Sequence, residues 1–331
     1  MAADSYIALV ERFPEHLYEA KSLGSGVRVS GVDKVVIAGM GGSAIAGSLL
    51  QIYCSEKAPN LHVHVSRSYE VPAFVDSKTL VFVSSYSGNT EETLSSFKSA
   101  MRKGARIVVV SSGGRILKQA EELNKPLVAL PEGIQPRAAL PYLFLPLLNV
   151  MHASGLIPDP SSEISAAIGS LKSAASGYKE RARSLAEKLV GKVPLIYSSD
   201  RFAGIAYRWK TQFNENAKIH AFSHFFPELN HNELVGFSKL NANYYAIMIE
   251  DEADSRRIKE RIKLTKDIIG GKGVPSTQIV IKGEHLLTRI LSAVHIGDLA
   301  SVYLAKLTGV DPEPVAIIED FKKQLGRVPF V

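Results

Sequence analysis

The chain has 331 residues, of which 46% are hydrophobic and 22% charged, and its formal net charge at pH 7 is +6. This composition excludes a disordered or fibrous chain, and at roughly 100–200 residues per domain the length predicts two globular domains. The basic residues are scattered and form no basic arm, so we expect an anionic metabolite as partner and no nucleic acid. The one cysteine, Cys54, excludes an intrachain disulfide and favours a reducing, cytoplasmic setting, and we expect its side chain in the core.

The first predicted strand, Val35–Ala38, runs into a glycine-rich turn and then a helix over 43–53. Gly39, Gly41 and Ala44 fit the G-x-G-x-x-A form of the dinucleotide fingerprint in its strand–turn–helix context. That fingerprint also expects an acidic residue near the end of the second strand, whereas the strand predicted over 61–65 is followed by Arg67. The pattern therefore leaves open an NADP site, a phosphate-binding turn, and a tight turn without a ligand.

The third predicted strand, Leu80–Val83, leads into a loop of hydroxyl side chains over 84–90 and then a helix over 90–103. The start of a helix presents unpaired N–H groups and the positive end of the helix dipole, which together bind anions. Gly88 allows the backbone to approach a ligand closely, and the Ser and Thr hydroxyls add donors. The loop therefore predicts a phosphate site, and it favours a sugar-phosphate protein over a dinucleotide-binding one.

The remaining elements predict two similar α/β halves, each with a parallel sheet covered by helices. In the first half we expect further strands at 106–110 and 126–130 and a helix at 115–123. In the second half, after connecting helices over 161–189, we expect strands at 194–198, 219–222, 244–249 and 278–281, and helices at 202–217, 286–307 and 314–325. The second half has no loop like 84–93, so we expect one phosphate site per chain.

The segment 138–156 carries no charged residue and is long enough to span a bilayer. It contains Pro141, Pro146, Asn149 and His152, so we expect a helix buried at a domain or subunit interface and no membrane contact. The first residues also lack the charged start and apolar stretch of a signal peptide.

Five motifs in order carry a resemblance to a known family. They are Gly-Met-Gly-Gly-Ser at 39–43, Ser-Tyr-Ser-Gly-Asn-Thr-Glu-Glu-Thr at 85–93, Gln-Pro-Arg at 135–137, Gln-Phe-Asn-Glu-Asn at 212–216 and Glu-Leu-Asn-His-Asn-Glu at 228–233. The first two resemble a sugar isomerase (SIS) domain, and together the five resemble the bifunctional phosphoglucose/phosphomannose isomerases. The resemblance implies two SIS-type domains, 1–157 and 158–331, that isomerise sugar phosphates without a cofactor.

The resemblance also implies roles for individual residues. Glu215 corresponds to the base that moves a proton between C1 and C2, Arg137 to the cation that stabilises the enediolate, and His231 to the group that opens the ring. In related enzymes this histidine reaches the neighbouring subunit's site, so a homodimer is implied. Lys322, next to Lys323, matches a lysine that approaches the sugar, and the position that discriminates between substrates falls near Val315. The phosphate anchors are Gly42, Ser43, Ser85, Ser87, Gly88 and Thr90.

Several alternatives remain open at this point. SIS domains also occur in sensors that bind a sugar phosphate without turnover, although no DNA-binding helix-turn-helix is evident here. The isomerase half of glucosamine-6-phosphate synthase is disfavoured because no glutaminase domain is present. His62 and His64 share a strand face, and His220, His224 and His231 cluster in the sequence, but neither set has zinc spacing with carboxylate support, so we expect no metal.

Overall fold

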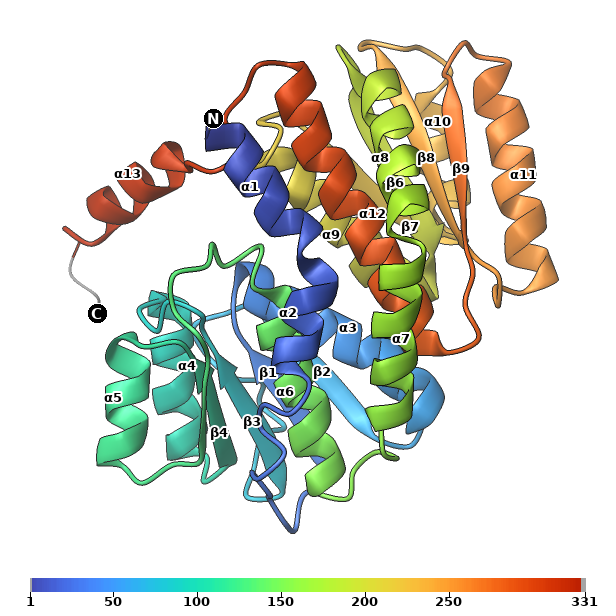
Figure 1. Ribbon diagram of the computed structural model, residues 1–331. Helices are drawn as coiled ribbons and strands as arrows, with labels where there is room; N and C mark the ends of the chain where they lie inside the picture. Colours follow the sequence, from blue (N-terminus) through green and yellow to red (C-terminus); the bar gives the residue numbers. More distant parts are fainter. Residues whose placement is uncertain (1, 329–331) are drawn as a thin grey trace.

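The computed structural model describes residues 2–328, which form two parallel sheets flanked by helices (Figure 1). The first sheet has five strands in the order β2-β1-β3-β4-β5, and the second has four in the order β7-β6-β8-β9. Every paired strand in both sheets is parallel. The predicted α/β class is therefore confirmed, and in each sheet helices cover the strands.

The elements of the first half are α1 (Ala2–Glu11), α2 (Phe13–Ala20), β1 (Lys34–Ala38), α3 (Gly41–Lys57), β2 (His62–Ser66), β3 (Thr79–Ser84), α4 (Glu91–Arg102), β4 (Arg106–Ser111), α5 (Gly114–Glu122), β5 (Leu127–Ala129) and α6 (Leu140–Ala153). Those of the second half are α7 (Ser161–Ser173), α8 (Ala175–Leu189), β6 (Val193–Ser199), η1 (Asp200–Phe202), α9 (Ala203–Glu215), β7 (Phe222–Phe226), η2 (Glu228–His231), α10 (Glu233–Gly236), β8 (Tyr244–Asp251), α11 (Arg256–Gly270), β9 (Ser276–Ile281), α12 (Leu286–Leu307) and α13 (Ala316–Leu325).

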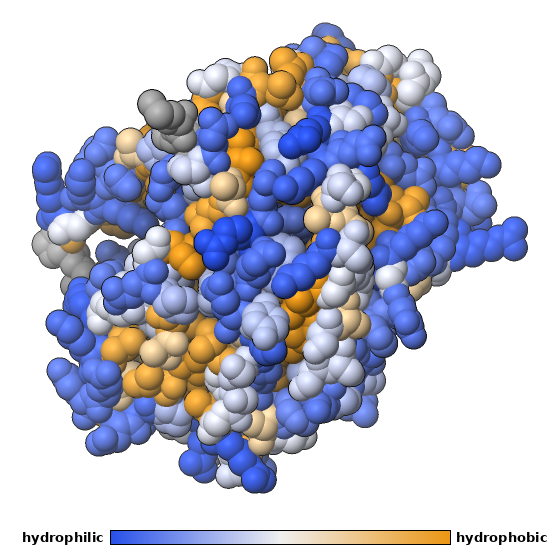
Figure 2. All heavy atoms as spheres, viewed as in Figure 1, coloured by the Kyte–Doolittle hydropathy of each residue, from blue (hydrophilic) through white to orange (hydrophobic). Residues whose placement is uncertain are grey.

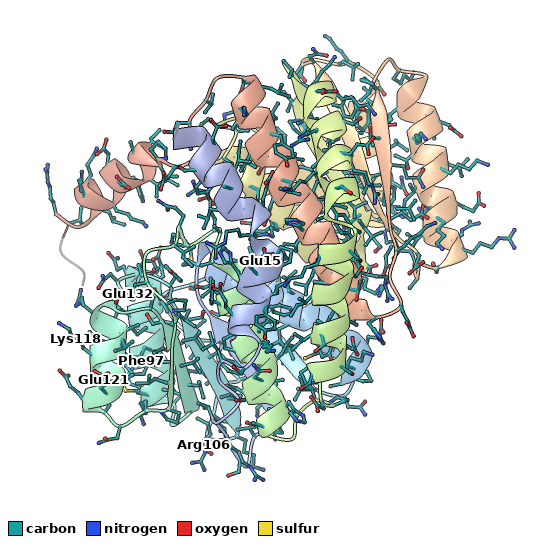
Figure 3. The ribbon with its side chains drawn as sticks, viewed as in Figure 1. Glu15, Phe97, Arg106, Lys118, Glu121 and Glu132 are labelled. Atoms are coloured by element: carbon teal, nitrogen blue, oxygen red, sulfur yellow. The ribbon has the colours of Figure 1, made fainter. Side chains whose placement is uncertain are left out.

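The central strand of the first sheet explains how the polar loops meet. All six residues of β3 are buried, as expected of a parallel strand covered on both faces, and the four between Thr79 and Ser84 form a continuous apolar run. The register aligns Ala38 of β1 with Val83 of β3, so the loops that follow these strands start side by side. Arg106, at the start of β4, and Glu132, beyond the end of β5, lie at opposite ends of this sheet (Figure 3). The edge near Glu132 is the carboxyl edge, where parallel sheets bind ligands.

Two apolar helices form much of the core. The uncharged segment around α6 is a buried helix that packs against α2 and α3, as expected. Among residues 2–328, α12 is the one helix long and apolar enough to cross a membrane, and 89% of its most apolar window is buried. It packs against α1, α7, α8 and α9, which is the environment of a core helix.

Several element boundaries differ by a few residues from the predicted ones, among them the starts of β7 and of the last helix. The second strand of the second half is Phe222–Phe226 and not 219–222, because the chain first closes the end of α9. Ile219 donates its N–H to the carbonyl of Phe213, and Lys218 adopts a φ of 56°, so these residues complete the helix end. The last helix starts at Ala316 and not at Pro314, which lies in the loop before it.

Cys54 lies buried near the end of α3, as predicted. Burial raises the pKa of its thiol to about 12. Because the thiolate is the reactive form, we expect negligible alkylation of the native protein by iodoacetamide at pH 8 and complete alkylation after unfolding in urea. Mass spectrometry of the intact chain measures this directly, and rapid labelling without denaturant would contradict the buried position.

Candidate active site

The loop after β3 is preorganised by its own side chains. The Ser85 hydroxyl donates to Thr90 Oγ1 at 3.0 Å and accepts the Gly88 N–H at 3.1 Å. The Asn89 N–H points to Ser87 Oγ at 3.4 Å. Thr90 precedes α4 without capping it through its side chain, so the first-turn N–H groups of this helix stay available for an anion. The loop thus has the donors that a phosphate requires.

Two hydroxyls beside this loop have no hydrogen-bond partner within residues 2–328. Ser84 Oγ, at the end of β3, and Thr93 Oγ1, in the first turn of α4, are both buried. An unpartnered buried hydroxyl is costly and is concentrated at sites that bind ligands or water. Thr93 belongs to the motif at 85–93, but the spacing of the hydroxyl residues in the sequence does not predict a role for it in phosphate binding. Its burial at the helix start adds it to the candidate phosphate site.

Gly88 fixes the path of the loop. Its φ is +67°, and a Cβ atom added there would lie 1.7 Å from the carbonyl oxygen of Gly113 in the next loop. The loops after β3 and β4 are therefore packed backbone against backbone, and a side chain at this position would force them apart.

We expect Gly88→Ala to lower the free energy of unfolding by about 3 kcal/mol, since it adds a backbone clash to the cost of a positive φ. Inhibition by inorganic phosphate should weaken at least about tenfold, because we expect the displaced loop to lose about 1.4 kcal/mol of phosphate-binding free energy, which is a factor of ten in affinity. Gly104→Ala is the matched control, because Gly104 has a φ of +69° with open space around its Cβ position. Urea unfolding and phosphate inhibition measure both variants, and equal effects would show that the Gly113 contact does not matter.

The glycine-rich turn after β1 joins this loop to a third segment. A Cβ atom on Gly39 would lie 2.7 Å from the Ser84 carbonyl oxygen, and one on Gly42 would lie 2.8 Å from the Pro136 carbonyl oxygen. Ser43 is buried in the first turn of α3. The turn after β1 therefore packs between the phosphate loop and the segment that carries the next residue, Arg137.

Arg137 and Glu215 come together from the two halves of the chain. Arg137 Nη1 lies 4.0 Å from Glu215 Oε2, and the exposed fractions of the two side chains are 5% and 31%. The rest of the guanidinium is held by protein: Nε donates to Asn216 Oδ1, and Nη2 donates to the carbonyls of Pro312 and Glu313. A buried fixed cation thus faces a half-exposed carboxylate, and the turn after β1 lies between the Arg137 segment and the hydroxyl loop.

A buried ion pair lies behind this arrangement. Arg208 of α9 and Asp298 of α12 form two hydrogen bonds at 2.6 and 3.0 Å, and Gln212 also donates to Asp298 at 3.0 Å. Burial raises the pKa of the Asp298 carboxyl, and the Arg208 guanidinium opposes that shift. Sequence reasoning missed this pair, although an aspartate within the apolar stretch 286–305 was a signal, because a buried charge requires a partner.

His231 does not approach Glu215 of the same chain. Glu215 ends α9 at the amino end of β7, whereas His231 ends η2 beyond its carboxyl end. The five residues of β7 separate them by roughly 16 Å at about 3.3 Å per residue. Asn230 is tied to α11 by hydrogen bonds with Thr265 and Arg261, which keeps η2 at that far edge.

Lys322 is also outside the site in a single chain. It lies on α13, which has no buried residue and stands apart from the rest of the fold (Figure 1). The helix exposes Ile317 and Phe321 at 83% and 63%, whereas hydrophilic residues cover much of the face seen in Figure 2. The lysine beside Glu215 is instead Lys218, whose Nζ donates to the Glu215 and Pro312 carbonyls and whose pKa is lowered by burial.

The residues considered for an NADP site and for a metal site can also be placed in the structure. Arg67 donates to Ser48 Oγ at 2.8 Å and stacks on the Tyr207 ring, so protein groups hold it. His62 and His64 have ring centroids 6.4 Å apart on β2. Across residues 2–328 there is no group of three or more His, Cys, Asp or Glu side chains placed to hold a metal ion.

The comparisons with known proteins agree with this architecture. Residues 29–134 match the SIS domain, and residues 178–325 match the bacterial phospho-glucose isomerase C-terminal SIS domain. A putative phosphosugar isomerase from Clostridium difficile has a similar fold, with a TM-score of 0.73 and 18% identity over 97% of this chain and 98% of that one. At that identity the likeness establishes the fold alone.

Relatives in sequence are much closer. A bifunctional phosphoglucose/phosphomannose isomerase from Caldicellulosiruptor bescii is 40% identical over 96% of this chain and 98% of its own length. A D-glucosamine-6-phosphate 4-epimerase from Sulfolobus acidocaldarius is 32% identical over 95% of this chain and 96% of its own length. Both matches extend over the residues of both sheets. With this coverage and identity, the chain belongs to the family of the bifunctional phosphoglucose/phosphomannose isomerases.

Proposed function

We propose that this protein reversibly converts glucose 6-phosphate and mannose 6-phosphate into fructose 6-phosphate through a cis-enediol(ate), without a metal or another cofactor. The observation that carries this proposal is the pairing of Arg137 and Glu215 at 4.0 Å, with the turn after β1 in contact both with the start of the hydroxyl loop and with Pro136, the neighbour of Arg137. An aldose–ketose isomerase needs a phosphate anchor, a base near C1 and C2, and a fixed positive charge for the enediolate oxygen. We propose that the hydroxyl loop, Glu215 and Arg137 supply these three groups, and that the protein works in the cytoplasm.

The division of work follows from the chemistry of each group. Ser43, Ser85, Ser87 and Thr90, with the N–H groups near Gly42 and Gly88, would hold the phosphate. Glu215 would take the proton from one carbon and return it to the other, which suits a half-exposed carboxylate. Arg137 would stabilise the oxyanion through Nη1, the guanidinium nitrogen that faces Glu215.

Ring opening is the step that we assign to a second chain. If His231 takes part, it must come from a partner, because β7 separates it from Glu215 of its own chain by roughly 16 Å. We therefore propose a homodimer in which His231 of one chain completes the site of the other. Exposed apolar residues on α13, on α10 beside His231 and at the start of β7 suit such an interface: Ile317, Phe321, Val235 and Phe222. Lys322 would reach a sugar only after α13 is repositioned in the dimer.

A mixed-dimer experiment tests the shared site. Glu215→Gln and His231→Gln should each be inactive as pure dimers, but random mixing of the two should restore roughly a quarter of wild-type activity, because half the dimers then contain one intact site. The measurement is the isomerase rate of co-refolded or co-expressed chains with two different tags. Failure to restore activity in purified hybrids would place His231 in its own chain's site or outside catalysis.

The activity itself is tested with fructose 6-phosphate as substrate. Formation of glucose 6-phosphate and mannose 6-phosphate is followed by coupled dehydrogenase assays, before and after treatment with a chelator. A sensor would bind the sugar phosphate without interconversion. A 4-epimerase, like the Sulfolobus relative, would instead change the configuration at C4 of glucosamine 6-phosphate, which NMR of the product detects.

A further inference from the structure

The guanidinium of Arg137 has little freedom. Of its five N–H groups, the one on Nε donates to Asn216 Oδ1 at 2.6 Å. Nη2 donates to the carbonyls of Pro312 and Glu313 at 2.6 and 2.8 Å. Nη1 remains for the substrate, and it lies 4.0 Å from the Glu215 carboxylate. The direction of Nη1 is therefore set by the hydrogen bonds at the other two nitrogens.

The side chain of Asn216 is itself fixed at both ends. It is fully buried, and while its oxygen accepts from Arg137, its Nδ2 donates to Ser301 Oγ at 2.9 Å. The Ser301 hydroxyl in turn donates to the carbonyl of Asp298 at 2.7 Å. If the amide turned over, its nitrogen would face the Arg137 Nε donor and that bond would be lost, and Ser301 could keep its bond to the amide only by giving up the Asp298 carbonyl. A chain of hydrogen bonds thus joins α12, through Ser301 and Asn216, to the guanidinium Nε of Arg137.

The same helix also holds the backbone of Arg137. Arg208 Nη2 donates to the Arg137 carbonyl at 3.0 Å and to Asp298 Oδ2 at 2.6 Å. Two residues of α12 therefore hold Arg137. Asp298 holds its backbone carbonyl through Arg208, and Ser301 holds its guanidinium Nε through Asn216. Glu215 precedes Asn216 in the chain, so one short segment carries both the carboxylate and the group that aims the cation toward it.

We propose that Asn216 is a positioning residue for the isomerisation: it sets the place of Arg137 Nη1 relative to the Glu215 carboxylate, and Ser301 holds it in that orientation. The inference rests on the proposed function and names a residue to which that function assigns no role. A misplacement of about 1 Å in a catalytic arrangement costs on the order of 10²-fold in rate. Asn216 thus acts through Arg137 and does not touch the sugar.

The test compares three quantities in Asn216→Ala: the rate with fructose 6-phosphate, the affinity for a five-carbon hydroxamate phosphate that mimics the enediolate, and inhibition by inorganic phosphate. We expect kcat to fall roughly 10–100-fold and the affinity for the mimic to fall by a similar factor, because transition-state mimics report transition-state contacts. Inhibition by phosphate should stay within about twofold, since the loop after β3 does not depend on Asn216.

The matched control is Asn214→Ala. Asn214 lies on the same helix end and donates to the Ile219 carbonyl at 2.8 Å, but it makes no bond to Arg137. We expect it to leave the ratio of mimic affinity to phosphate affinity unchanged. Ser301→Ala keeps Asn216 Oδ1 as the acceptor for Arg137 but removes the hydroxyl that holds the Asn216 amide. The losses in kcat and in affinity for the mimic should therefore be smaller in Ser301→Ala than in Asn216→Ala.

Two results would overturn the inference: parallel loss of mimic and phosphate affinity in Asn216→Ala, or unchanged kcat in that variant. If Asn216→Ala does not fold, Ser301→Ala decides by the same ratio, and an unchanged ratio there overturns the inference. A wild-type protein that binds the mimic but does not isomerise fructose 6-phosphate would instead overturn the proposed function. The binding ratios would still report on Asn216 in that case.

Discussion

Glu215→Gln is expected to lower kcat by about 10⁴-fold, which is the upper end of the effect of removing an acid–base group. The amide has nearly the same size as the carboxylate but cannot accept and return a proton. The KM for fructose 6-phosphate should stay within about threefold, because the phosphate is bound by a separate loop. A large loss in kcat with an almost unchanged KM is what loss of a proton shuttle predicts.

Steady-state kinetics with fructose 6-phosphate measure this effect, and inhibition by phosphate verifies that the variant still binds. Glu187→Gln is a suitable control because Glu187 is exposed on α8, away from Arg137. Exchange of the C1 or C2 hydrogen with deuterated water should also stop in Glu215→Gln. Turnover within tenfold of wild type would remove Glu215 from the role of base.

Much of the first sheet and its ligand edge could be predicted from sequence. The run over 80–83 is continuous and apolar because β3 is covered on both faces, and hydroxyl residues with Gly88 begin where it ends. Such local signals depend on residues close together in the chain. The loop over 84–90 can therefore be predicted without any tertiary contact.

The catalytic pairing could not be predicted from local patterns. The hydrogen bond between Arg137 and Asn216 joins residues 79 positions apart, and the ion pair between Arg208 and Asp298 joins residues 90 positions apart. No local periodicity encodes such contacts, and only the family motifs pointed to Arg137 and Glu215. The predicted start of β7 is wrong for a related reason, because Lys218 at positive φ closes the end of α9 without a glycine to signal it.

The asymmetry between the two halves also has a physical basis. At the carboxyl edge of the second sheet, β8 ends in the buried residue Asp251, and Asp254 follows. Arg201 and Arg289 form ion pairs with Asp251 there. Carboxylates thus occupy the edge that corresponds to the hydroxyl loop after β3. Because both arginines are already paired with carboxylates, neither is a free cation for a phosphate, and one phosphate site per chain remains a prediction.

Arg137→Met is expected to damage both stability and catalysis. Methionine fills a similar volume but leaves Asn216 Oδ1 and the Glu313 carbonyl without the donor they have now, whereas the Pro312 carbonyl keeps Lys218 as a donor. At about 1–3 kcal/mol for each unsatisfied buried acceptor, with partial relaxation, we expect the free energy of unfolding to fall by about 3 kcal/mol. Loss of the fixed cation should also lower kcat by on the order of 10²–10³-fold, as for other groups that stabilise an oxyanion.

Urea unfolding and steady-state kinetics separate these two effects, and Arg137→Lys tells charge from geometry. A lysine keeps the positive charge but cannot bond Asn216, Pro312 and Glu313 from a planar fork, so we expect it to recover part of the stability and less than a tenth of the rate. Arg181→Met is the matched control, since Arg181 is exposed and donates to the Val280 carbonyl, and its loss should stay within about 0.5 kcal/mol. If Arg137→Met were destabilised but kept its kcat, the guanidinium would hold the two halves of the chain together without stabilising the enediolate. The oxyanion would then need another cation. Lys218, which donates to the Glu215 carbonyl, is the nearest candidate.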